Sequence, residues 1–188
     1  MMLSSESKKY LLKIARKAIN HYLETGEKLQ PDPASVPSPD LIGDGACFVT
    51  LYYDDKLRGC IGTLKAHRPL VEDVVENALA SAFGDPRFTM LTKSEFQGTR
   101  ISISVLSRPE PLEASGPEEL LKKLIPNEHG LIMERGIHRA TFLPAVWKEI
   151  PDKQEFLRHL SMKAGLFPEA WKEPGVKFRV YTTEEFSE

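Results

Sequence analysis

Residues 46–62, with the sequence ACFVTLYYDDKLRGCIG, carry the pattern that decides the local fold. The first part is rich in aromatic and β-branched side chains, which favour strands. Asp54-Asp55-Lys56 then supplies a turn, and the chain returns as a second strand. The run therefore predicts a β-hairpin over residues 46–64, with a turn of two or three residues within Asp54-Asp55-Lys56.

The second arm of this hairpin places a thiol in an unusual setting, because Cys60 has Gly59 and Gly62 as close neighbours. Such small neighbours let a ligand or another backbone approach the sulfur. Side chains two positions apart on a strand share a face, so Arg58 is expected beside the thiol, with Leu57 toward the core. A guanidinium in that place favours the thiolate. The alternative interpretation is a small core cysteine whose glycines relieve crowding between backbones.

The register of the hairpin also bears on the second cysteine. A turn at Asp54-Asp55 places Val49 opposite Cys60, and Cys47 then lies beyond bridging distance. A turn at Asp55-Lys56 places Leu51 there and leads to the same conclusion, and a three-residue turn would put Cys47 on the opposite face. Cys47 is therefore predicted to be a core residue without a disulfide partner.

The run 45–63 resembles the AMMECR domain family, whose hallmark is the leucine-arginine-glycine-cysteine-isoleucine-glycine string found here at 57–62. Further segments match the family in order over nearly the whole chain, and only the proline-rich stretch 30–44 offers nothing to align. These segments are Phe83-Gly84-Asp85-Pro86-Arg87-Phe88, 101–109, 129–132, 142–144, 155–157 and 163–166. The resemblance implies two α+β subdomains with the hallmark near a cleft between them.

The resemblance also bears on function, although the family has no settled reaction. Bacterial and archaeal relatives are often encoded or fused with a Memo-type protein and a radical-SAM protein, which implies one step of a shared modification pathway. The first hypothesis is therefore an enzyme or enzyme component that uses Arg58-Gly59-Cys60 to bind a small anionic ligand or substrate. The alternative is a non-catalytic regulatory module that binds a peptide or protein, since eukaryotic relatives are discussed in regulatory terms.

Other residues complete the candidate site. A cysteine nucleophile at Cys60 needs a base, and His129 is the candidate because it precedes a glycine in a family-like segment. Arg87 is expected to bind a carboxylate or phosphate, with Asp85 orienting it. The alternative for Asp85 and Arg87 is an internal ion pair that locks a proline turn.

The order of sequence patterns predicts an α+β fold with two linked subdomains of mixed or antiparallel sheet and flanking helices. A helix is expected over residues 1–25, a proline-rich loop over 26–45 and a two-subdomain core over 46–188. Expected elements within the core follow from periodicity and capping signals. They are helices over 69–84, 117–125 and 152–165, a short turn capped by Thr92 and Glu95, strands over 101–105 and 176–180, and a hairpin over 130–143.

Composition narrows the classes of function. The chain has 188 residues, a formal net charge of -2 and no block of basic residues, which argues against a large nucleic-acid-binding surface. No run approaches the ~18 apolar residues of a membrane span, and no apolar signal region opens the chain. Because the chain has only two cysteines, we expect reduced thiols and a cytoplasmic protein. The cysteines have no nearby histidine pair, so no metal site is expected. No nucleotide- or cofactor-binding motif is present, so no cofactor is expected.

Overall fold

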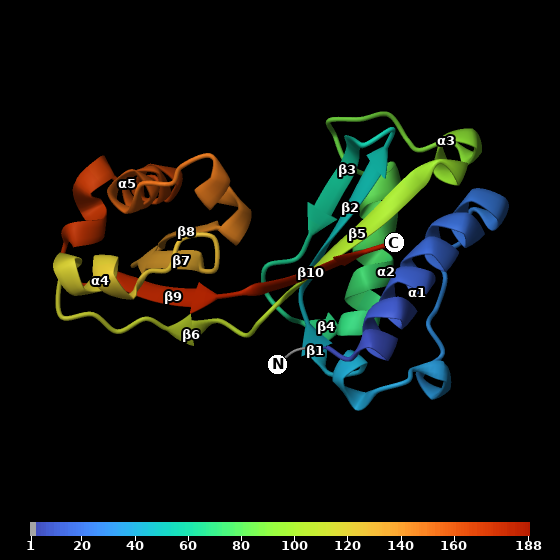
Figure 1. Ribbon diagram of the computed structural model, residues 1–188, viewed down its shortest axis with the longest axis horizontal. Coiled ribbons are helices and arrows are strands. Elements are labelled where there is room, and N and C mark those ends of the chain that lie inside the picture. The colour runs from blue at the N-terminus through green and yellow to red at the C-terminus, as the bar shows by residue number, and fades with distance from the viewer. Residues whose placement is uncertain (1–2) are drawn as a thin grey trace. The chain divides into compact units, whose positions relative to one another are not determined.

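The computed structural model describes residues 3–188 and divides the chain into two compact units (Figure 1). The first unit contains the chain up to Leu106 together with Glu184–Glu188, and the second is Ser107–Thr183. Each unit combines helices with an antiparallel sheet of its own, which confirms the predicted α+β class.

The first unit is built on a four-stranded sheet in the order β10-β5-β2-β3. Its strands are β2 (Cys47–Tyr53), β3 (Lys56–Gly62), β5 (Thr99–Leu106) and β10 (Thr183–Ser187). Its helices are α1 (Ser5–Thr25), α2 (Leu70–Phe83) and the short α3 (Lys93–Gln97). Two 3-10 turns, Pro33–Ser35 and Pro39–Leu41, lie in the proline-rich stretch, and β1 (Asp44–Gly45) pairs with β4 (Arg68–Pro69). Because β3 and β5 both run antiparallel to β2, the chain between them makes a crossover through α2.

Local signals account for the helix ends in this unit. The Ser4 side chain accepts a hydrogen bond from the Ser7 N–H, and Gly26 ends α1 with a left-handed φ of 75°. Thr92 and Glu95 form the predicted capping box of α3. Pro69 occupies the N-cap of α2 rather than its first helical position.

One face of the first sheet is buried under α1 and α2. Alternate residues of β2 and β5 share a core with the apolar faces of both helices. The buried strand residues are Cys47, Val49, Leu51, Ile101 and Ile103. Cys47 is therefore a core residue, as predicted.

The hairpin forms as predicted, but its register differs. The turn is Asp54-Asp55, and both residues have positive φ, as a two-residue hairpin turn requires. A β-bulge leaves Arg58 without a partner, so Thr50, not Val49, lies opposite Cys60. The register expected for a two-residue turn at Asp54-Asp55 was wrong at Cys60, because a pattern of residue types does not reveal a single inserted residue.

The second unit is built on a four-stranded sheet in the order β6-β9-β7-β8. Its strands are β6 (Glu110–Pro111), β7 (Gly130–Arg135), β8 (His138–Phe142) and β9 (Lys177–Tyr181). Its helices are α4 (Pro117–Lys123), α5 (Lys153–Lys163) and the 3-10 helices Pro144–Lys148 and Pro168–Lys172. Trp147 stacks on Phe156 with 3.6 Å between ring centres in its core. Asp152 caps α5, and Glu155 pairs with Arg158.

Across residues 3–188, no helix combines the length and the apolar composition needed to cross a membrane.

Candidate functional site

The structure brings most of the predicted site residues together in the first unit. The hallmark strand β3 carries Cys60, and the segment that follows α2 lies along its free edge. The predicted base, His129, belongs to the second unit. There its Nδ1 accepts from the Ile125 N–H at 3.2 Å and its carbonyl accepts from Trp147 Nε1 at 2.7 Å. A catalytic role for His129 stays a prediction.

The Cys60 side chain lies on the sheet face opposite the helices. Its strand partner Thr50 belongs to the alternate set of β2 residues that point away from the core. The Thr50 hydroxyl donates to the Cys60 sulfur at 3.2 Å, and Cys60 is partly exposed. The thiol is therefore reachable from solvent, unlike a packed core cysteine.

The two hallmark glycines make room for the protein itself. A Cβ at Gly59 would lie 2.1 Å from the Ser81 carbonyl oxygen of α2, and one at Gly62 would lie 2.2 Å from the Phe48 ring. The Ser81 hydroxyl also accepts from the Ile61 N–H and donates to a β2 carbonyl, so α2 rests closely on the hairpin. Crowding against the α2 backbone therefore explains Gly59, which faces the helix. The Phe48 ring fills the space beside Gly62.

Asp85 and Arg87 bind the backbone of Cys60 at the free edge of β3. The Asp85 Oδ2 accepts from the Cys60 N–H at 2.9 Å, and the Arg87 Nη2 donates to the Cys60 carbonyl at 3.2 Å. The two side chains also form an ion pair at 2.7 Å. Together they occupy backbone groups that another strand would otherwise bind.

Electrostatics reinforce this arrangement. The hydrogen bond from Arg87 lowers the pKa of Asp85, against the opposing effect of burial, so the carboxylate stays ionised. The hydrogen bond with Asp85 in turn raises the pKa of Arg87. The Arg87 side chain is 53% exposed, so a guanidinium next to the thiol's strand faces solvent.

Arg58 does not serve as the charge partner that the strand alternation predicted for Cys60. Its Nε and Nη2 donate to the two oxygens of Glu95 at 3.1 and 3.2 Å, and its guanidinium lies 5.8 Å from the centre of the Phe88 ring. The bulge at Arg58 breaks the alternation, so Arg58 is buried whereas Leu57 is exposed. The hydrogen bond to Arg58 lowers the pKa of Glu95 to about 2.

The other thiol is held in a buried polar cluster. Cys47 donates its backbone N–H to Asp73 at 3.0 Å and its S–H at 3.4 Å, and Asn77 and Thr63 also bind that carboxylate. Burial, followed by the nearby charge of Asp73, raises the pKa of the Cys47 thiol well above its ordinary value. Cys47 is therefore poorly suited to react.

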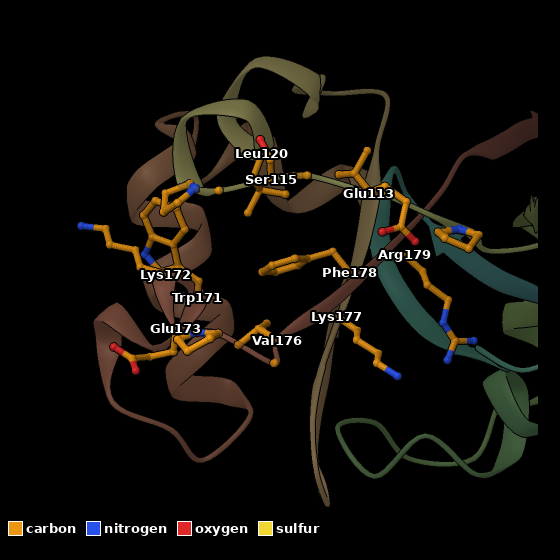
Figure 2. Close-up of a pocket in the computed structure, with 17 residues that line it drawn as sticks. Glu113, Ser115, Leu120, Trp171, Lys172, Glu173, Val176, Lys177, Phe178 and Arg179 are labelled. Atoms are coloured by element: carbon orange, nitrogen blue, oxygen red, sulfur yellow. The ribbon is translucent and has the colours of Figure 1, made fainter.

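The second unit contains a pocket of about 560 Å³ that was not predicted from the sequence. Segments 111–117 and 171–179 form most of its wall, and Figure 2 shows the Phe178 ring projecting toward Trp171. No predicted site residue lines it. Its only sequence signal is the proline and glycine content of both segments, which marks loops without indicating that they face each other.

Within residues 3–188, no group of three or more histidine, cysteine, aspartate or glutamate side chains is arranged to hold a metal ion.

Comparisons with known proteins agree with the hallmark. A family model described as AMMECR1 matches residues 12–186. Protein MK0488 of Methanopyrus kandleri is 42% identical over 194 residues, covering 99% of this chain and 90% of that protein. Protein MJ0810 of Methanocaldococcus jannaschii is 36% identical over 191 residues, covering 100% of this chain and 92% of that protein. The crystal structure of uncharacterized protein PH0010 from Pyrococcus horikoshii, 37% identical, matches with a TM-score of 0.85 and covers 99% of this chain and 93% of that one.

Proposed function

The chain belongs to the AMMECR1 family, and we propose that its first unit binds a small anionic ligand beside Cys60 and Arg87. In this proposal the protein is one component of a modification pathway that includes a Memo-type and a radical-SAM protein. The pathway assignment rests on the family resemblance, whereas the ligand class rests on the residues of the site.

One observation carries the ligand class. The solvent-facing guanidinium of Arg87 is held by Asp85 and by the Cys60 carbonyl. Its Nε and Nη2 are used internally, and its Nη1 makes no hydrogen bond with any of residues 3–188. A positioned guanidinium with a free N–H group is a good partner for a carboxylate, sulfate or phosphate. An anion bound there would lie near the partly exposed thiol, the candidate nucleophile.

Binding of an anion is expected to protect Cys60 from alkylation. With iodoacetamide near pH 7, Cys60 should react faster than Cys47, which is buried and has a raised pKa. Sulfate, phosphate or acetate should slow the reaction of Cys60 in the native protein. Arg87→Met should abolish this protection, and Arg87→Lys should retain part of it, because lysine keeps the charge without the planar fork. Mass spectrometry of peptides containing each cysteine measures both rates.

Arg139→Met is the matched control, because Arg139 is about as exposed as Arg87 and also pairs with one carboxylate. Anions should slow the alkylation of Cys60 in this variant as much as they do in the native protein. The proposal is wrong if none of the three anions slows alkylation of Cys60, or if Arg87→Met leaves the protection unchanged.

A second candidate function, a peptide-binding regulatory module, is favoured by the pocket of the second unit. Its wall combines aromatic and aliphatic side chains, which together suit an apolar side chain of a peptide. They include Leu112, Leu120, Trp171, Val176 and Phe178.

Ala114→Trp tests this candidate by filling the pocket with a large side chain. Peptides enriched from a displayed library on the native protein should lose binding to this variant. Ala145→Trp, at an exposed position of the same unit outside the pocket wall, should keep it. Equal binding by both variants would exclude the pocket as the peptide site.

A further inference from the structure

The Arg58 guanidinium has a hydrogen-bond donor that nothing in the described chain satisfies. Its side chain is only 10% exposed, and both of its bonds to Glu95 use Nε and Nη2. Among residues 3–188, no acceptor is found for the buried Nη1. Native proteins rarely keep a buried polar group unpaired, so this donor needs an explanation such as a bound ion, water or ligand.

Arg87 repeats the arrangement of Arg58. It too presents Nε and Nη2 to a carboxylate, that of Asp85, and leaves Nη1 as its remaining donor group. The two guanidiniums share one neighbour, since the Phe88 ring centre lies 5.8 Å from the Arg58 carbon and 5.5 Å from the Arg87 carbon. One aromatic side chain therefore adjoins two arginines, each with a spare N–H pair.

We propose that Arg58 and Arg87 together bind the phosphate group of a small ligand, and that the Phe88 ring covers Arg58 until the phosphate displaces it. This inference rests on the proposed function and specifies the anion and its second arginine. The ligand is either a phosphate monoester or free phosphate, which offer the same oxygens to the site.

The chemistry of the donors favours phosphate over a carboxylate. Each guanidinium already has a carboxylate partner, so affinity must come from directed N–H groups more than from net charge. A carboxylate has two oxygens in one plane and is satisfied by one guanidinium. A tetrahedral phosphate presents its terminal oxygens in different directions and can accept from two arginines at once.

Phe88 is suited to a displaceable cover. Its distance of 5.8 Å from Arg58 is near the outer limit of about 6 Å for a cation–π contact, so the ring replaces an acceptor only weakly. The ring is half-buried, and the chain beyond it is exposed at Thr89 and Met90. No packed core holds that part of the segment in place.

Phe88→Leu tests the inference by replacing the aromatic ring over Arg58 with a smaller side chain. Isothermal titration with inorganic phosphate should show about fivefold tighter binding than in the native protein, because the cation–π contact no longer competes. A parallel titration with phenyl phosphate compares the two ligand sources. Tighter binding of phenyl phosphate indicates a phosphate monoester, and tighter binding of inorganic phosphate indicates the free ion. Acetate should gain nothing from the substitution. Phe167→Leu, at an exposed phenylalanine of the second unit, should leave phosphate affinity unchanged.

Arg58→Lys supplies a second measurement. It keeps the charge beside Glu95 but lacks the free Nη1, so phosphate should bind it no more tightly than acetate does. Unchanged phosphate affinity in Phe88→Leu, or full affinity in Arg58→Lys, overturns the two-arginine site. In either case the proposed function still stands if anions protect Cys60 through Arg87, so the two failures are distinguishable.

Discussion

Gly59→Ala is expected to destabilise the first unit by about 3 kcal/mol or more, a large effect for one added methyl group. The new Cβ would lie 2.1 Å from the Ser81 carbonyl oxygen and 3.0 Å from the Ser81 carbonyl carbon. Both atoms belong to the backbone of α2, which can retreat only by lifting the helix off the hairpin. Urea unfolding followed by circular dichroism measures the loss as a lower midpoint.

Gly43→Ala is the matched control for that substitution in the same unit. Its Cβ would meet only the Asp40 carbonyl oxygen, at an ordinary distance of 3.7 Å. We expect its unfolding free energy to stay within about 0.5 kcal/mol of the native value. If Gly59→Ala were as stable as Gly43→Ala, the close packing of α2 on the hallmark strand would be wrong.

Glu95→Gln is expected to cost roughly 2 kcal/mol of stability. Glutamine can still serve the capping box with Thr92, so the substitution mainly removes the negative charge from the buried Arg58 guanidinium. Breaking a fully buried ion pair costs about 3–5 kcal/mol, and the smaller figure reflects the 30% exposure of the Glu95 side chain. Glu155→Gln removes the carboxylate of the surface pair with Arg158 and should cost no more than about 0.5 kcal/mol.

The Glu95 variant should also change the response to acid. Arg58 lowers the folded-state pKa of Glu95 to about 2, below the ordinary value of 4.5. A lowered carboxyl pKa stabilises the fold above the unfolded-state pKa, and this stability is lost as the pH falls toward the folded-state value. The difference in stability between the native protein and Glu95→Gln should therefore shrink between about pH 4.5 and pH 2. A constant difference over that range would contradict the ion pair.

Much of the fold could be predicted from residues that lie close together in the sequence. Ser4 and Gly26 mark the ends of α1, and Thr92 with Glu95 marks the start of α3. These signals act within one turn of a helix, so they can be read directly from the order of residues. The C-terminal strand β10 was not predicted, because its glutamates do not resemble a strand and its place beside β5 is a long-range pairing.

The candidate site shows the same division between features set by local sequence and features set by long-range contacts. Its hallmark, its aspartate-proline-arginine segment and the pairing of Asp85 with Arg87 were identified from the sequence, but the partners of Arg58 and Cys60 were not. Alternation along a strand predicted Arg58 beside Cys60. The bulge instead lets Arg58 pair with Glu95, and Arg87 is the arginine that binds the backbone of Cys60.

The sequence by itself thus determined the family, the hairpin, the helix boundaries and the residues of interest, because these depend on local chemistry and on motif order. Only the tertiary structure decided which arginine faces solvent, what fills the space above the glycines, and which strand completes the first sheet. Those outcomes depend on contacts between segments far apart in the chain, and on one inserted residue in β3 whose effect no local pattern records.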